Sequence, residues 1–130
     1  LSEASLLHDI GIFKCYAPQI HCRGTHAYIE HGFLGAEILR NEGLPKHARV
    51  CERHTGTGLT TNTIVSLNLA LPKQDFIPVS LDEQVICYAD KFFSKSDLPT
   101  MYSYEKIANE LAKYGNEQVL KFAEWHEKFG

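Results

Sequence analysis

The sequence has no excess of positive charge. Its 130 residues contain 13 lysines and arginines against 16 aspartates and glutamates, which gives a formal net charge of −3 and a pI near 6.2. A protein that holds a nucleic-acid backbone by charge normally carries a basic surface. We therefore expect no nucleic-acid polymer as a partner, whereas charge alone does not exclude a small nucleotide.

The sequence also lacks the features of membrane and secreted proteins. No apolar run approaches the roughly 20 residues that span a bilayer, and no cleavable signal is visible. The four cysteines form no Cys-x-x-Cys arrangement, and the apolar neighbours of Cys51 and Cys87 indicate small buried side chains. Free thiols are typical of a reducing compartment. We expect a cytoplasmic protein with no membrane partner.

Neither an internal repeat nor a low-complexity segment divides the chain. At 14.7 kDa it is long enough to bury on the order of two-thirds of its unfolded surface in one core. We therefore expect residues 1–130 to form a single domain.

Strand signals are missing, whereas helix signals recur. Thr25 precedes apolar residues at three-to-four spacing, and Gly43 follows them as a stop, which predicts a helix over residues 26–42. Pro45 is suited to the first turn of a helix over residues 45–54.

The second half of the chain continues this pattern. Ser80 and Glu83 form a capping box at the start of a long helix that carries Asp90. Two further helices are expected over residues 104–114 and 117–129, and three stretches are expected to be irregular, at residues 11–24, 55–63 and 71–79. The sequence predicts an all-α fold.

Five residues of metal-ligand type are distributed along this scaffold. The pair His8-Asp9 lies in an apolar run that we expect to form a core helix, and His31, His54 and Asp90 lie in or at the ends of the later helices. Helical scaffolds that bring imidazoles and carboxylates together are used to hold transition metals. The pattern predicts a metal site.

The ordered set resembles the HD-domain superfamily of metal-dependent phosphohydrolases, in its HDIG form. The likeness covers about residues 5–96 and depends on four segments: Leu6–Gly11, His31-Gly32, Glu52–Gly56 and Tyr88–Lys91. The segments around His54 and Asp90 are also similar to bacterial HD hydrolases of dinucleoside tetraphosphates. The resemblance implies an HD-domain-like helical bundle.

The resemblance also implies a ligand arrangement. One metal would be held by His8, Asp9, Asp90 and a histidine on an upstream helix, and a second metal by Asp9, His31 and His54. Only seven residues precede His8, so we expect this N-terminal helix to be missing from the chain.

The implied reaction is metal-dependent hydrolysis of a small phosphate ester or nucleotide by a metal-activated water. One or two divalent ions would serve, and mixed imidazole and carboxylate ligation suits iron, manganese, nickel or zinc. Asp9 would bridge the ions as a catalytic residue, and Lys91 and Lys95 would contact the substrate phosphates. For the two lysines, a solvated helix face is the alternative.

Two other interpretations fit the same residues. A non-catalytic HD module could bind a nucleotide or a partner and use the metal structurally, in which case every metal position would be filled by protein ligands. Oxygenases that use two iron ions also occur among HD relatives, in a divergent branch.

Overall fold

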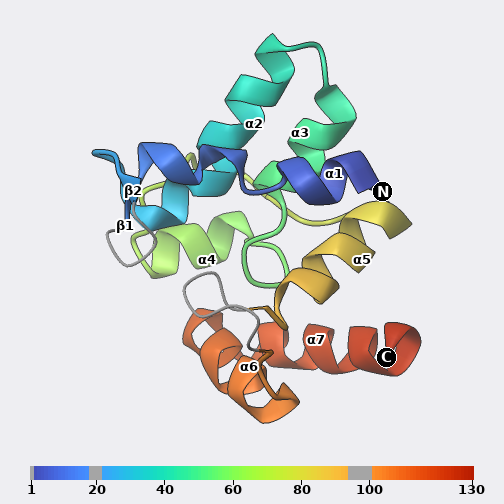
Figure 1. The fold of residues 1–130 in the computed structure, drawn as a ribbon. Helices are drawn as coiled ribbons and strands as arrows, with labels where there is room; N and C mark the ends of the chain where they lie inside the picture. Colours follow the sequence, from blue (N-terminus) through green and yellow to red (C-terminus); the bar gives the residue numbers. More distant parts are fainter. Residues whose placement is uncertain (1, 18–21, 94–100) are drawn as a thin grey trace.

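The computed structural model describes residues 2–17, 22–93 and 101–130, and in these residues the fold is mostly helical (Figure 1). Its α-helices are α1 (Ser2–Leu7), α2 (His31–Asn41), α3 (Pro45–Glu52), α4 (Thr61–Ser66), α5 (Leu81–Asp90), α6 (Tyr104–Leu111) and α7 (Asn116–Phe129). Short 3-10 helices are η1 (Ile10–Lys14), η3 (Tyr28–Glu30) and η4 (Ala112–Tyr114). The prediction of a mainly α-helical protein is confirmed, and the HD-specific bundle is not.

The later helices begin where their capping residues predict. The Ser80 hydroxyl accepts a hydrogen bond from the Glu83 backbone N–H at 3.1 Å and starts α5. Pro45 occupies the first turn of α3, where its missing N–H costs nothing. The helix predicted over residues 26–42 is shorter, because η3 comes first and α2 starts only at His31.

Three short elements lie wholly or partly in segments that were expected to be irregular. Strands β1 (Tyr16–Ala17) and β2 (Cys22–Arg23) pair antiparallel, each with only two residues. Helix α4 has six residues, and the Thr60 hydroxyl caps it by accepting from the Thr63 N–H at 3.1 Å. Elements this short contain too few residues to show a hydrophobic period, which is why the sequence pattern missed them.

The pair His8-Asp9 does not lie on a helix, contrary to the sequence prediction. Helix α1 ends at Leu7, and the two residues form a turn before η1. A side chain at Gly11 would collide with backbone atoms of His31 and Gly35, so the absence of Cβ lets η1 lie directly against α2. This close approach brings the His8-Asp9 turn to the start of α2.

The described residues include three hydrophobic clusters, and two of them hold the longer helices together. One joins α2 and α3 through buried residues that include Leu39 and Cys51, with Leu7 of α1 packed against it. The other joins α5, α6 and α7 around Phe122, Trp125 and Cys87. The predicted burial of both thiols is confirmed. Among the described residues, no helix is both long and apolar enough to cross a membrane.

Candidate functional site

The structure brings the five predicted ligand residues together at the ends of four segments. His8 and Asp9 occupy the turn after α1, His31 is the first residue of α2, His54 follows the end of α3, and Asp90 is the last residue of α5. Two groups have ligand atoms within 4.8 Å of one another: His8, His54 and Asp90, and Asp9, His31 and His54. We call the five side chains the His-Asp cluster.

The spacing inside the second group matches that of metal ligands. The Nε2 atoms of His31 and His54 lie 2.9 Å apart, and Asp9 Oδ1 lies 3.2 Å from His54 Nε2 and 3.4 Å from His31 Nε2. Bonds of about 2.1 Å to one ion, at angles between about 90° and 110°, place ligand atoms about 3.0 to 3.4 Å apart. The three atoms therefore fit around a single ion.

The backbone orients all three imidazoles in the same way. Each Nδ1 lies within hydrogen-bond distance of the carbonyl oxygen three residues earlier: His8 to Ser5 at 2.6 Å, His31 to Tyr28 at 2.7 Å and His54 to Cys51 at 2.6 Å. A carbonyl only accepts, so each Nδ1 must carry the hydrogen. The neutral rings then present their Nε2 lone pairs to the cluster, as metal-bound histidines do.

The consequence is a convergence of electron pairs. In the neutral rings, Nε2 of His31 and of His54 face each other and Asp9 Oδ1 with no hydrogen between these three atoms. Such an arrangement needs a positive charge at its centre, either a proton on one of the rings or a metal ion. The residues thus fit a metal ion on geometric and chemical grounds.

Protonation differs between the two ends of the cluster. Complete burial lowers the pKa of His54 to about 4, so this ring is neutral at pH 7. Burial also acts to lower the pKa of His8, but hydrogen bonds to Asp9 and Asp90 outweigh it and raise that pKa to about 10. Burial acts to raise the pKa of Asp9, yet the surrounding imidazoles of His31, His54 and His8 hold it well below its usual range.

These shifts predict a stability maximum near neutral pH for the metal-free protein. The neutral form of His54 stabilises the fold fully above pH 6.5, and this contribution, on the order of 3 kcal/mol, is lost as the pH falls toward 4. Charged His8 stabilises the fold fully below pH 6.5, and that contribution is lost as the pH rises toward 10. Urea unfolding between pH 4 and 10 measures both losses of stability, the acidic limb toward pH 4 and the alkaline limb toward pH 10. His8→Gln should flatten the alkaline limb, and an unchanged alkaline limb in this variant would contradict the assignment.

The two predicted lysines have different outcomes. Lys91 Nζ donates to the His54 backbone carbonyl at 2.7 Å and lies 3.3 Å from Asp90 Oδ2, with a side chain only 12% exposed. It is therefore not part of a solvated helix face. Lys95 lies outside the described residues. Contact of either lysine with a phosphate stays a prediction.

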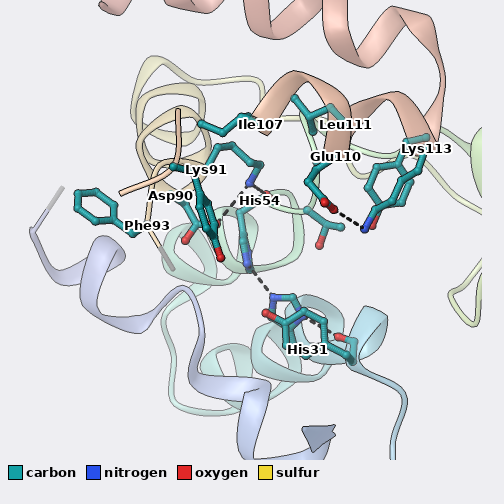
Figure 2. A pocket seen from close by; sticks show the side chains of 14 residues that line it. His31, His54, Asp90, Lys91, Phe93, Ile107, Glu110, Leu111 and Lys113 are labelled. Atoms are coloured by element: carbon teal, nitrogen blue, oxygen red, sulfur yellow. Dashed lines mark hydrogen bonds and ion pairs between the residues drawn. The ribbon is translucent and has the colours of Figure 1, made fainter. Parts of the chain in front are cut away.

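A cavity of about 500 Å³ opens beside the His-Asp cluster (Figure 2). His31, His54, Asp90 and Lys91 line one side, and residues of α6 and η4 line the other, among them Ile107, Leu111 and Tyr114. Figure 2 shows the His54 ring pointing toward His31 below Asp90 and Lys91. The α6 and η4 wall could not be predicted from the sequence, because its residues are ordinary members of an amphipathic helix and the turn after it.

Gln118 on α7 is a second residue that the sequence did not reveal. Its buried side chain accepts from the Thr57 N–H at 2.7 Å and from the Thr57 hydroxyl at 2.8 Å, and it donates to the Gly58 carbonyl at 2.6 Å. A side chain on Gly56, whose φ is +57°, would meet the Gln118 Oε1 atom at 2.7 Å. Gln118 therefore fixes the loop that follows His54 against α7.

Comparison with known proteins relates the chain to three longer ones. It is 42% identical over 86 residues, 65% of this chain, to an uncharacterized protein of Methanocaldococcus jannaschii. It is 33% identical over 133 aligned residues, 98% of this chain, to a tRNA (cytidine(56)-2′-O)-methyltransferase of Picrophilus torridus. A protein of the same name from Thermoplasma volcanium is 30% identical over 95 residues, 72% of this chain.

The chain spans only part of each relative: 43%, 33% and 24% of their lengths, in the same order. No family model matches the chain. No solved structure matches it either.

These relatives overturn the functional interpretation of the sequence. The two relatives with functional names are tRNA methyltransferases, so the assignment to HD-domain phosphohydrolases, the hydrolase activity and the non-catalytic HD alternative are wrong. The expected cofactor of hydrolysis, one or two iron, manganese, nickel or zinc ions, is wrong for the same reason, because the named relatives are methyltransferases. The assignment failed because its motifs are short and describe only ligand types, which do not determine a reaction.

The expected partners need the same correction. A small phosphate or nucleotide was expected and a nucleic-acid polymer excluded, but the named relatives act on tRNA. The exclusion used the net charge of 130 residues, whereas the aligned segment is a third or less of each named relative. Charge on one segment carries no information about RNA contacts made by the rest of such a protein.

Proposed function

We propose that this chain is a helical domain that serves tRNA 2′-O-methylation, with tRNA as the partner. The observation that carries the proposal is the alignment of 98% of the chain, at 33% identity, with the tRNA methyltransferase of Picrophilus torridus. The Thermoplasma volcanium enzyme of the same name supports it over 72% of the chain.

The chain contributes one part of such an enzyme. Because it corresponds to a third or less of the named relatives, methyl transfer by the complete protein requires residues outside the aligned segment. The donor in this reaction is S-adenosylmethionine. We assign no site for this donor among the described residues, because the cavity beside α6 is bounded by the His-Asp cluster, whose converging lone pairs suit a small ion.

We also propose that the His-Asp cluster is a metal-binding site of this domain, formed by His8, Asp9, His31, His54 and Asp90. Its support is the 2.9 to 3.4 Å spacing of three acceptor atoms and the backbone carbonyls that hold each ring by Nδ1. We assign the ion no part in methyl transfer. Its contribution would be to neutralise the converging lone pairs and to fix the four segments that meet there.

Two further assignments belong to the same proposal. Residues 1–130 act as one domain, in keeping with the loop after His54 being fixed to α7 by Gln118. The location that fits a tRNA-modifying protein is the cytoplasm. Limited proteolysis tests the assignment to one domain. A single domain should yield no stable fragment that ends between α5 and α6.

A methylation assay tests the proposed process. The complete protein that contains this chain is incubated with tRNA transcripts and S-adenosylmethionine carrying a tritiated methyl group. We expect label in the tRNA, and mass spectrometry of the digested product should find 2′-O-methylcytidine. A transcript with uridine in place of cytidine 56, the position named for the relatives, is the matched control and should stay unlabelled.

The same assay separates the domain from the rest of the protein. Deleting the segment that corresponds to residues 1–130 should lower methylation or tRNA binding. If the complete protein neither methylates nor retains tRNA, or if the deletion changes neither property, the proposed role in tRNA methylation is wrong.

A further inference from the structure

Lys91 connects two parts of the His-Asp cluster that are far apart in the sequence. It directly follows Asp90 at the end of α5, yet its ammonium group reaches the backbone carbonyl of His54 at 2.7 Å. The same Nζ atom lies 3.3 Å from Asp90 Oδ2. One buried cation thus contacts two segments that each supply a ligand.

Lys91 contacts atoms other than those that face the cluster. Lys91 holds Oδ2 of Asp90, while Oδ1 of the same carboxylate lies 2.9 Å from His8 Nε2 and faces the cluster. At His54, Lys91 holds the main-chain carbonyl, and the ring is free to point its Nε2 toward His31. Groups that hold ligands by their non-coordinating atoms commonly tune metal sites.

We propose that Lys91 is a positioning residue of the His-Asp cluster, fixing the Asp90 carboxylate and the His54 segment in ligand geometry. This inference rests on the metal-binding site proposed above. It replaces the phosphate contact expected for Lys91, because the side chain is only 12% exposed and its ammonium group already donates inward to His54 and Asp90. The positive charge also offsets part of the carboxylate charge of Asp9 and Asp90 beside His8.

The cavity offers a matched control. Lys113 also lines the cavity, but its side chain is 59% exposed. Its ammonium group lies 3.8 Å from the Glu110 carboxylate, which is not a member of the His-Asp cluster. Both Lys91→Met and Lys113→Met keep the length of the side chain and remove the charge. Only the first should disturb the cluster, whereas a general effect of cavity charge would appear in both.

Cobalt(II) titration gives the first readout. In the absence of any anion that could mimic a substrate, Lys91→Met should weaken Co²⁺ binding by about 10- to 100-fold and shift the visible absorption bands. Lys91→Arg, which keeps a charged donor, should recover part of the affinity, and Lys113→Met should match the wild type. Unchanged Co²⁺ affinity and absorption in Lys91→Met would overturn the proposal and favour a phosphate contact.

Nuclear magnetic resonance of the metal-free protein gives a second readout that does not depend on metal binding. The imidazole ¹⁵N and ¹H shifts of His8 and His54 should change in Lys91→Met. The His8 ring contacts Asp90, and the His54 ring belongs to the residue whose backbone carbonyl Lys91 holds. They should stay unchanged in Lys113→Met. If the wild type binds no Co²⁺ but these shifts respond to Lys91, the metal site is wrong and the positioning role stands. If the shifts do not respond, the positioning role is wrong whatever the metal result.

Discussion

Replacing Asp9 with alanine is expected to abolish the metal binding that we propose for the His-Asp cluster. Among the described residues, Asp9 is the carboxylate that contacts all three imidazoles, with Oδ1 at 3.2 and 3.4 Å from His54 and His31 and Oδ2 at 3.3 Å from His8. Its loss removes a ligand from the group with His31 and His54 and a neighbouring charge from the other. We expect the dissociation constant for Mn²⁺ or Co²⁺ to rise by more than about 100-fold, beyond the usual cost of an outer-shell change.

Calorimetry with each ion and elemental analysis of the purified protein measure this effect. Asp82→Ala is the control, because Asp82 is an exposed carboxylate in the first turn of α5, outside the cluster. The control should bind like the wild type. Equal metal content in wild type and Asp9→Ala would show that the ion sits elsewhere, and a wild type that stays metal-free after refolding with excess Mn²⁺ or Co²⁺ would show that the cluster is not a metal site.

The positions of the ligand residues could be predicted from the sequence, whereas their local structure could not. His54 follows the end of α3 and Asp90 ends α5, near where the helical pattern placed them, whereas His31 begins α2 instead of lying inside a helix over residues 26–42. His8 and Asp9 lie in a turn, because the packing of η1 against α2 at Gly11 and Gly35 overrides the apolar run that suggested a helix. A contact between backbones that are distant in sequence leaves no periodic signal.

The same limit explains what was missed around the cluster. The hydrogen bonds of Gln118 with Thr57 and Gly58 join residues about 60 positions apart, and nothing near Gln118 distinguishes it from a surface glutamine. Lys91 was noticed because it follows Asp90, but its inward direction depends on where the His54 carbonyl lies. Residue type and spacing therefore identified candidate ligands, and tertiary structure decided which groups hold them.

Function was less accessible than fold. Five ligand-type residues in a helical chain restrict the chemistry to groups that those side chains can bind, but they do not specify a reaction. The relatives named as tRNA methyltransferases align with 98% and 72% of the chain, and the proposed process is taken from these longer proteins.

The largest stability loss is expected on replacing Phe122 with alanine. Phe122 is fully buried at the centre of the cluster that joins α5, α6 and α7. Its ring centroid lies 5.4 Å from Tyr88, 5.8 Å from Phe92 and 5.4 Å from Tyr104. Removing a buried phenylalanine side chain costs about 3 to 5 kcal/mol, because apolar contacts are lost and a cavity is left. Urea unfolding followed by circular dichroism should show this decrease in the free energy of unfolding.

Leu120→Ala is the control on the same helix, since its side chain is 63% exposed and should change the free energy of unfolding by no more than about 0.5 kcal/mol. The Phe122 substitution should also affect the His-Asp cluster, because Gln118 lies one helical turn before Phe122 and holds the loop after His54. We therefore expect Phe122→Ala to weaken metal binding at temperatures where the variant is still folded, and Leu120→Ala to leave it unchanged. A stability loss below about 1 kcal/mol for Phe122→Ala would mean that the aromatic cluster does not hold α7 to α5 and α6.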